Sequence, residues 1–224
     1  MYNKEKRVWS STKKISSSGA LSPLLLILWP TKENNLHYMK IEKKTTLMMV
    51  IRSLRKGHQS SYQSSSDDDG GETVLFENAE MVEGLDVDPF TENIYWTEVT
   101  RGTVVVGHKN HDGDYERLVL ARDLHSPKGI TIASEFGKMF IVEGRISHVI
   151  SVWHMDGGHR KELVHVYGTV SGMAYDGKHL YFSDSLRSTI ERIKVGENRT
   201  VLRSHLGTPV AMDISSGSVF WLTQ

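Results

Sequence analysis

The sequence predicts an all-β fold: a partial β-propeller built from repeated four-stranded antiparallel units. Three observations predict it. An aromatic tetrapeptide recurs about every 40 residues, a small-aliphatic motif precedes each copy, and Gly and Asp turns separate short β-runs with no helical stretch between them. A period near 40 residues is typical of one supersecondary unit used repeatedly, so we expect function to lie on an assembled surface.

The aromatic motif occurs four times, at steps of 45, 41 and 39 residues. Each copy is an aromatic residue, an apolar residue, usually a hydroxyl or β-branched residue, and usually an acid. Successive side chains of a strand point to opposite faces, so each motif is expected to pack on the sheets before and after its own. The copies are Tyr95-Trp96-Thr97-Glu98, Phe140-Ile141-Val142-Glu143, Tyr181-Phe182-Ser183-Asp184 and Phe220-Trp221-Leu222-Thr223.

A quieter motif, small-aliphatic-x-aliphatic, lies 9 or 11 residues before each aromatic motif. Its copies begin at Gly84, Gly129, Gly172 and Ala211. The two motifs keep the same order in every unit, which identifies them as neighbouring strands of one repeated sheet.

Short β-runs occur in the same order in each unit, and turns at 112–113, 156–158 and 196–198 join the last two runs of each unit. A first run at 73–76 precedes the units. The runs fall at 85–88, 94–97, 103–106 and 118–120 in the first unit, at 130–133, 139–142, 149–153 and 162–166 in the second, and at 173–176, 180–183, 189–195 and 199–202 in the third.

Charge divides the chain into two parts. Residues 1–60 carry 12 Lys and Arg against 3 Asp and Glu, whereas residues 61–224 carry 15 against 24. Residues 1–65 are basic and Ser-rich and show no sustained period of 2 or 3.6, so we expect a disordered leader there. The β-propeller part is predicted to span 72–224. Without interleaved aromatic residues, the basic charge does not indicate nucleic-acid binding.

Cysteine is absent, which excludes disulfides and thiolate metal sites. The most apolar run, 20–29, is too short for a membrane span, which needs about 20 residues. Following a basic stretch, that run also has features of a long signal peptide. Whether 1–65 is a secretory signal or a sequence foreign to the domain stays open.

The repeated residues closely resemble the YWTD repeat, also called the LDL-receptor class B repeat. The resemblance covers about 72–224 and rests on three motifs that recur in phase. They are Asp88-Pro89 with Asn93-Ile94-Tyr95-Trp96-Thr97-Glu98, Ser126-Pro127-Lys128-Gly129-Ile130 and Asp156-Gly157-Gly158-His159-Arg160.

The resemblance implies a six-bladed propeller on the extracellular side of the plasma membrane, in a receptor related to the LDL receptor. It also implies a role in ligand binding or acid-dependent release during endocytosis, with lipoprotein or yolk protein as ligand. A signalling co-receptor that binds a Wnt-pathway protein is the alternative. A scaffold role also stays open.

Two departures from the family pattern affect these expectations. The terminal acid, which the family uses as a structural hydrogen-bond acceptor, is Asp only at 184, and Glu98, Glu143 and Thr223 replace it elsewhere. The chain holds about 3.5 blades, or 15 strands, where six blades of four would need 24. We therefore expect a fragment whose partners include further blades and EGF-like modules of a parent receptor.

Several polar residues are candidates for function. Five in predicted turns are possible ligand contacts: Arg101, Lys109, Asp114, Tyr115 and Arg145. Asn198 begins an N-glycosylation sequon in a predicted turn. Nine histidines lie in the β part, and we expect them to be solvated rim residues, with an acid-sensing role as the alternative.

An enzyme is the rival class, because some six-bladed propellers hold a metal in the central channel and hydrolyse esters. Asp86 and Asp213 occupy equivalent innermost positions, but their counterparts are Thr131 and Ala174, which leaves too few oxygen ligands for calcium. No Gly-x-Ser-x-Gly, His-Glu-x-x-His or phosphate-loop motif is present. The sequence therefore predicts no catalytic residue, metal or cofactor.

A fragment with open blade edges is expected to associate, because unpaired strand edges bind other strands. Size-exclusion chromatography and calorimetry of residues 72–224 test this expectation. A compact monomer that melts cooperatively would contradict it.

Overall fold

The computed structural model describes residues 7–11, 24–30, 36–42, 48–54, 73–76, 78–215 and 217–223. Side chains are described in 75–76, 78–214 and 217–223. The described residues form strands and a single 3₁₀ turn, η1 (Ser134–Phe136).

Three four-stranded antiparallel sheets, in which neighbouring strands follow one another along the chain, make up most of the molecule. Blade 1 contains β6 (Val82–Val87), β7 (Ile94–Glu98), β8 (Thr103–Lys109) and β9 (Tyr115–Ala121). Blade 2 contains β10 (Pro127–Ala133), β11 (Lys138–Glu143), β12 (His148–His154) and β13 (Lys161–Val166). Blade 3 contains β14 (Val170–Tyr175), β15 (Leu180–Asp184), β16 (Thr189–Ile193) and β17 (Thr200–Arg203).

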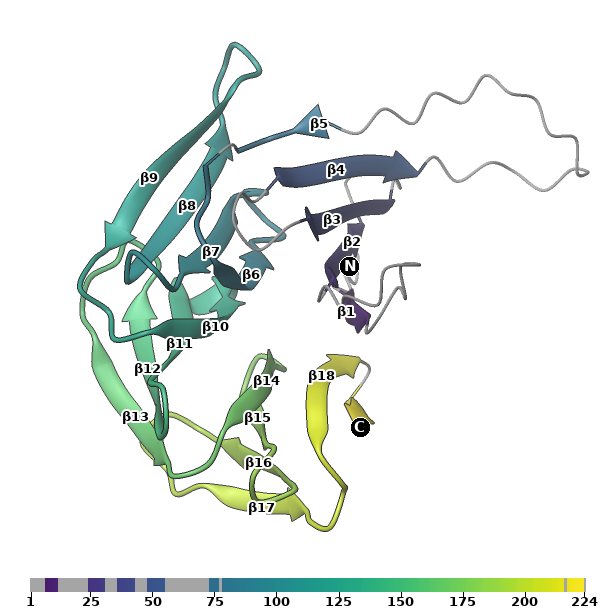
Figure 1. Cartoon of the computed structure of the whole chain (residues 1–224), viewed down its shortest axis with the longest axis vertical. Coiled ribbons are helices and arrows are strands. Elements are labelled where there is room, and N and C mark those ends of the chain that lie inside the picture. Colours follow the sequence, from purple (N-terminus) through teal and green to yellow (C-terminus); the bar gives the residue numbers. More distant parts are fainter. Residues whose placement is uncertain are drawn as a thin grey trace, which may run out of the picture.

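A two-stranded sheet of β18 (Pro209–Ser215) and β19 (Ser218–Thr223) follows blade 3. Figure 1 shows the sheets succeeding one another along an arc, with β6, β10, β14 and β18 on its inner side. The inner strands contact one another, β10 with β6 and β14, and β14 with β18. This arrangement confirms the predicted partial β-propeller.

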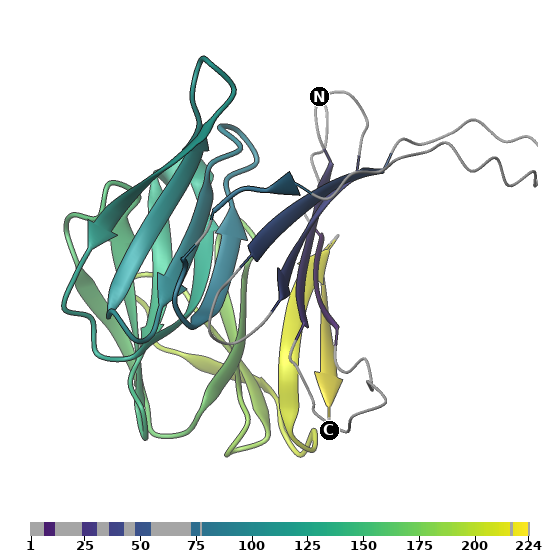
Figure 2. The same cartoon turned by 45° about the horizontal axis from the view of Figure 1, so that its top comes forward.

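A fifth sheet contains β1 (Arg7–Ser11), β2 (Leu24–Pro30), β3 (Leu36–Glu42), β4 (Met48–Leu54) and β5 (Thr73–Val74). β5 lies at its edge, as predicted for the outermost strand of a preceding blade, and β1 contacts β18 (Figure 2).

The strands within 7–54 differ from the disordered leader that the sequence predicts for 1–65. These strands pair with one another in antiparallel fashion and so satisfy their backbone groups mutually. The other residues of 1–65 lie outside the described ranges, and the domain boundaries at 65 and 72 remain a prediction.

The aromatic motif packs as predicted, with neighbouring residues on opposite faces of each sheet. Tyr95 lies in an apolar cluster with Ile130 and Met139 of blade 2, whereas Trp96 lies on the other face with Leu75 and Phe76. Fully burying such a ring contributes roughly 1.5–3 kcal/mol relative to leaving it exposed. Each interface between blades is therefore a shared core.

The same alternation builds the other two interfaces. Phe140 of blade 2 and Phe182 of blade 3 lie in one cluster, and Tyr181 lies with Met212 of β18 in another. Phe140 also contacts Tyr175 of blade 3, with ring centroids 5.3 Å apart.

Hydrogen bonds between inner strands join the blades near the apolar clusters. The Thr97 hydroxyl accepts from the Gly84 N–H (3.0 Å) and donates to the Lys128 carbonyl of blade 2. In blade 3 the Ser183 and Ser171 hydroxyls lie 3.1 Å apart, and Ser171 donates to the Pro209 carbonyl. The hydroxyl at the third motif position therefore contacts the next blade directly in blade 1 and through Ser171 in blade 3.

The small first residue of the small-aliphatic-x-aliphatic motif is required because the inner strands of neighbouring blades approach closely there. A Cβ at Gly84 would collide with the Lys128 carbonyl, and one at Gly172 would press on the backbone of Met212. Larger residues at these two positions would push neighbouring blades apart.

The second motif position is buried to different degrees in different sheets, so an alanine substitution there is expected to lower the unfolding free energy by different amounts. Phe182 is fully buried, whereas Trp221 at the equivalent position in β19 is 38% exposed. We expect Phe182→Ala to cost roughly 3–5 kcal/mol of unfolding free energy, and Phe182→Leu to cost less, since a smaller cavity is left. Trp221→Ala is expected to cost about 1 kcal/mol or less. Urea unfolding of the full chain measures all three, and equal losses for the two alanine variants would contradict the assigned interface.

Candidate functional site

Strand direction sorts the loops into two opposite rims. Neighbouring strands are antiparallel, so the loops after the second and fourth strands of each blade lie at one end and the other loops lie at the opposite end. We name the first set the arginine rim; its loops are 99–102, 122–126, 144–147, 167–169, 185–188 and 204–208. We name the opposite set the hairpin rim; its loops are 88–93, 110–114, 134–137, 155–160, 176–179 and 194–199.

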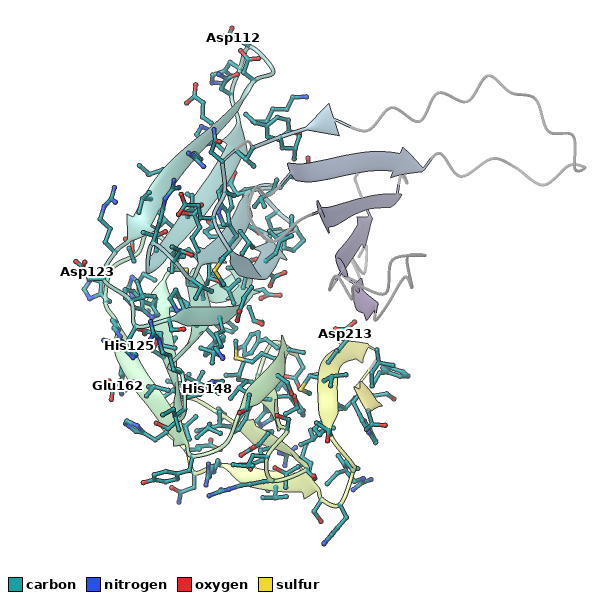
Figure 3. All side chains as sticks on the ribbon, in the orientation of Figure 1. Asp112, Asp123, His125, His148, Glu162 and Asp213 are labelled. Carbon is teal, nitrogen blue, oxygen red and sulfur yellow. The ribbon has the colours of Figure 1, made fainter. Side chains whose placement is uncertain are left out.

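The five predicted contact residues do not form one site. Arg101 and Arg145 lie on the arginine rim, whereas Lys109, Asp114 and Tyr115 surround the β8–β9 turn on the hairpin rim. Figure 3 shows Asp112 at the tip of that turn, far from Asp123 and His125 on the arginine rim. Lys109 is the last residue of β8 and Tyr115 is the first residue of β9, so neither lies in the turn where the sequence placed it. The Lys109 ammonium is 5.9 Å from the Tyr115 ring centroid.

The arginine rim carries an arginine in the loop after the second strand of each blade. Arg101, Arg145 and Arg187 follow the acid of the aromatic motif by two or three residues and are all exposed. The Arg101 guanidinium is held by Glu98 (3.2 Å) and Glu80 (3.0 Å), and that of Arg187 lies 3.9 Å from Asp184. Among the described residues, none pairs with Arg145.

Exposed apolar side chains lie on the same rim. Ile146 is 90% exposed, Leu186 is 73% exposed and Tyr167 is 72% exposed. Sequence reasoning missed all three. The adjacency of Ile146 and Leu186 to the rim arginines is the signal that could have identified two of them.

A hollow of about 210 Å³ lies on the inner side of the propeller near this rim. Its polar lining comes from Glu83, Lys128 and Ser171, which immediately precede the small residue of the companion motif in blades 1, 2 and 3. The site therefore combines a hollow of mixed polar and apolar lining with cationic and apolar loops around it, an arrangement suited to contact with another macromolecule.

The acids of the aromatic motif are buried and structural. Glu98 accepts from the Trp96 indole (3.2 Å) and the Thr103 hydroxyl (3.2 Å). Asp184, with its shorter side chain, accepts from the backbone of Leu186 (3.0 Å) and Arg187 (3.1 Å) in the turn after β15.

The glutamate of blade 2 reaches further than an aspartate would. Glu143 accepts from the His125 N–H (3.2 Å) and lies 3.0 Å from the Arg160 guanidinium. The same guanidinium lies 5.6 Å from the centroid of the Trp153 ring. The longer acid therefore reaches an arginine of the repeat motif.

One histidine differs from the expected solvated rim residues. His148, at the start of β12, is fully buried at the interface between blades 2 and 3, and its Nδ1 accepts from the Val170 N–H (2.9 Å). Neither its Nε2 nor Asp184 Oδ2 makes a hydrogen bond within the described part of the chain. Burial, followed by the charge of Lys128, lowers the pKa of His148, while the Asp184 carboxylate opposes that shift.

The inner aspartate of blade 1 has a structural role. The Asp86 carboxylate accepts from its neighbour Val87 (2.8 Å) and from Ile132 of blade 2 (2.8 Å), so it joins two inner strands. Asp213 repeats the first of these bonds with Ile214 (2.7 Å). Among the described residues, no three His, Asp or Glu side chains are grouped closely enough to hold a metal ion.

The N-glycosylation sequon lies away from the arginine rim. Asn198 is exposed in the turn between β16 and β17 on the hairpin rim. Within the ranges that the structure describes, no helix has the length and apolar character needed to cross a bilayer.

The chain is similar to a vitellogenin receptor of Solenopsis invicta, with 27% identity over 156 residues. The match covers 67% of this chain and 8% of that receptor, so the chain corresponds to a small part of its relative. No protein-family model matches the chain.

Solved structures show the same fold. A chain of a nidogen–laminin complex matches with a TM-score of 0.69 and 20% identity, covering 86% of this chain and 69% of that one. A virginiamycin B lyase from Staphylococcus aureus matches with a TM-score of 0.51 and 14% identity, covering 98% and 82%, respectively. At these identities the matches establish the fold alone. Together with the repeated motifs and the receptor match, they confirm the resemblance to a YWTD propeller of LDL-receptor-related proteins.

Burial of His148 predicts a pH dependence of stability. Because its pKa in the folded chain lies below the ordinary 6.5, the unfolded chain binds the proton first as pH falls. The stability contributed by neutral His148 is therefore complete above pH 6.5 and declines as pH falls below it. Protonation would also remove the lone pair that accepts the Val170 N–H.

Urea unfolding at pH 7.5 and 5.5 measures this effect. His148→Gln keeps a hydrogen-bond acceptor without a titrating group, so we expect it to lose less stability between the two pH values than the wild-type chain. His125→Gln, at an exposed position, is the matched control. Identical pH dependence in all three chains would contradict the assignment.

Proposed function

We propose that this chain is a non-catalytic, extracellular protein-recognition module of an LDL-receptor-related receptor. Its role is to contribute to the binding or acid-dependent release of a protein ligand during endocytosis. The repeated YWTD-type motifs and the similarity to a vitellogenin receptor support the receptor class. Because the match spans 8% of that receptor, ligand and cellular route belong to the proposal.

The observation that carries the proposal is the composition of the arginine rim. Arginine and large apolar side chains are enriched where proteins bind one another, and here both are exposed on the same loops. Ile146 and Leu186 each adjoin a rim arginine. An exposed apolar side chain beside a guanidinium gives a partner both apolar area to bury and a charge to pair.

A protein ligand with acidic and apolar side chains fits this rim best. Arg145, exposed and unpaired within the described residues, would offer two parallel hydrogen bonds to a carboxylate. A yolk protein is the first candidate, because the similar receptor is named for vitellogenin. Lipoprotein is the second endocytic candidate, and a Wnt-pathway protein is the ligand of the alternative, signalling role.

Enzyme activity is not favoured by the geometry. Asp86 is engaged by backbone N–H groups of two inner strands, so its role is to join the blades. The virginiamycin B lyase shares the fold at 14% identity, and a shared fold does not transfer an activity.

Substitutions on the two rims test the proposal. We expect Arg145→Glu and Ile146→Asp each to weaken binding of the full chain to purified vitellogenin at least about tenfold, the loss of roughly 1.4 kcal/mol. Asp114→Arg, on the hairpin rim, is the control and should leave affinity unchanged. Biolayer interferometry at neutral pH provides the measurement.

Two results would contradict the proposal. Equal affinity of the wild-type chain and both arginine-rim variants for vitellogenin would show that the ligand does not bind this rim. A wild-type chain that binds neither vitellogenin nor low-density lipoprotein would overturn the endocytic role.

A further inference from the structure

We propose that Asn198 carries an N-linked glycan, and that this glycan occupies the hairpin rim and leaves the arginine rim open for a protein ligand. The inference rests on the proposed function for the extracellular route of the chain. It adds a modification site and assigns one rim to sugar and the other to protein.

The acceptor sequence is unique within the chain. Asn198-Arg199-Thr200 is the only Asn-x-Ser/Thr tripeptide among the 224 residues, and its middle residue is not proline. Any N-linked glycan on the natural sequence would therefore be assigned to one residue.

The turn that presents the acceptor is well defined. The Glu197 N–H donates to the Lys194 carbonyl (2.9 Å), and the two side chains form an ion pair of 2.7 Å. Asn198 follows this turn and is exposed, and so is Thr200 at the start of β17. Both side chains that the modification needs are thus accessible on the folded surface.

The residue between them is anchored to its own blade and to the neighbouring one. The Arg199 Nε lies 3.5 Å from the buried Glu191 carboxylate, and its Nη1 donates to the His165 carbonyl of blade 2 (3.4 Å). Arg199 therefore points inward, toward the neighbouring blade. Asn198 and Thr200, on either side of Arg199, are both exposed and stay free of this contact with blade 2.

The chemistry requires an outward amide and a lipid-linked oligosaccharide as donor. The Asn198 amide nitrogen forms a bond to the anomeric carbon of the sugar and loses one proton, while the lipid diphosphate leaves. No oxidant or reductant takes part. The exposed Val195 and Val201 flank the acceptor, so the first sugars would also cover apolar surface.

The location of the sugar has a consequence for binding. Asn198 lies in a loop of the hairpin rim, whereas Arg145 and Ile146 lie on the opposite rim. A glycan on Asn198 would keep large partners away from the hairpin rim of blade 3. The arginine rim would stay accessible.

Expression of the full chain behind a cleavable secretion signal in cultured insect cells tests the modification. We expect peptide N-glycosidase to lower the apparent mass by one step. Asn198→Gln and Thr200→Ala should abolish that step, and Thr200→Ser should retain it. A secreted wild-type chain without a glycan would overturn the inference.

A second acceptor separates failure of this site from failure of the secretory route. Arg145→Asn creates an Asn-x-Ser tripeptide with Ile146 and Ser147 on the arginine rim, and adding Ser147→Ala removes the acceptor while keeping the first substitution. If the engineered rim acceptor is modified and Asn198 is not, the inference fails while the extracellular route stands. If the chain is secreted and neither is modified, the inference alone fails, because the added signal sets the route and vitellogenin binding tests the proposed function separately.

The same variants test the assignment of the two rims. We expect removal of the Asn198 glycan to leave vitellogenin binding unchanged within about twofold. We expect the glycan introduced by Arg145→Asn to weaken binding more than the matched chain that also carries Ser147→Ala. Equal weakening by both glycans would overturn the assignment.

Discussion

Burial of side-chain rows between neighbouring sheets is the interaction on which the rest of the described structure depends. No blade has an interior of its own, because each is a single sheet whose two faces must be covered by the sheets beside it. Tyr95 and Trp96 illustrate the rule, since one ring faces blade 2 and the other faces the opposite side. The hydroxyl of Thr97 and the missing side chain of Gly84 then allow the inner strands to approach closely.

This constraint also decides where function can lie. Because both faces of blades 1 to 3 are used for packing, these blades offer a partner mainly the loops at the two rims. The loops after the second strands, which bear Arg101, Arg145 and Arg187, all lie on one rim because the repeat returns each loop to the same end. The acids of the aromatic motif stay buried and hold the ends of these loops through hydrogen bonds. The motif therefore positions the exposed arginines for a partner, although its own acids are not exposed to one.

The sequence predicted the repeat well because burial imposes a period. The strand order of blades 1 to 3 and the opposite-facing aromatic residues follow from alternation and from the 40-residue period. Features that depend on contacts between blades carry no such local signal. Burial of His148 depends on Val170, 22 residues away, and the separation of Arg101 from Asp114 depends on strand direction. The strands within 7–54 were not predicted because β2 and β4 begin with continuous apolar runs, which show no alternation.

A double-mutant cycle across one interface tests this account most directly. Phe140 of β11 and Tyr175 of β14 are in ring contact, whereas Phe140 and Trp96 belong to different interfaces. Urea unfolding of the Phe140→Leu and Tyr175→Leu single variants and of the double variant is predicted to give a coupling of about 0.5–1.5 kcal/mol. The control pair Phe140→Leu and Trp96→Leu is predicted to be additive within about 0.5 kcal/mol. Additivity of the first pair would contradict the claim that neighbouring blades share their cores.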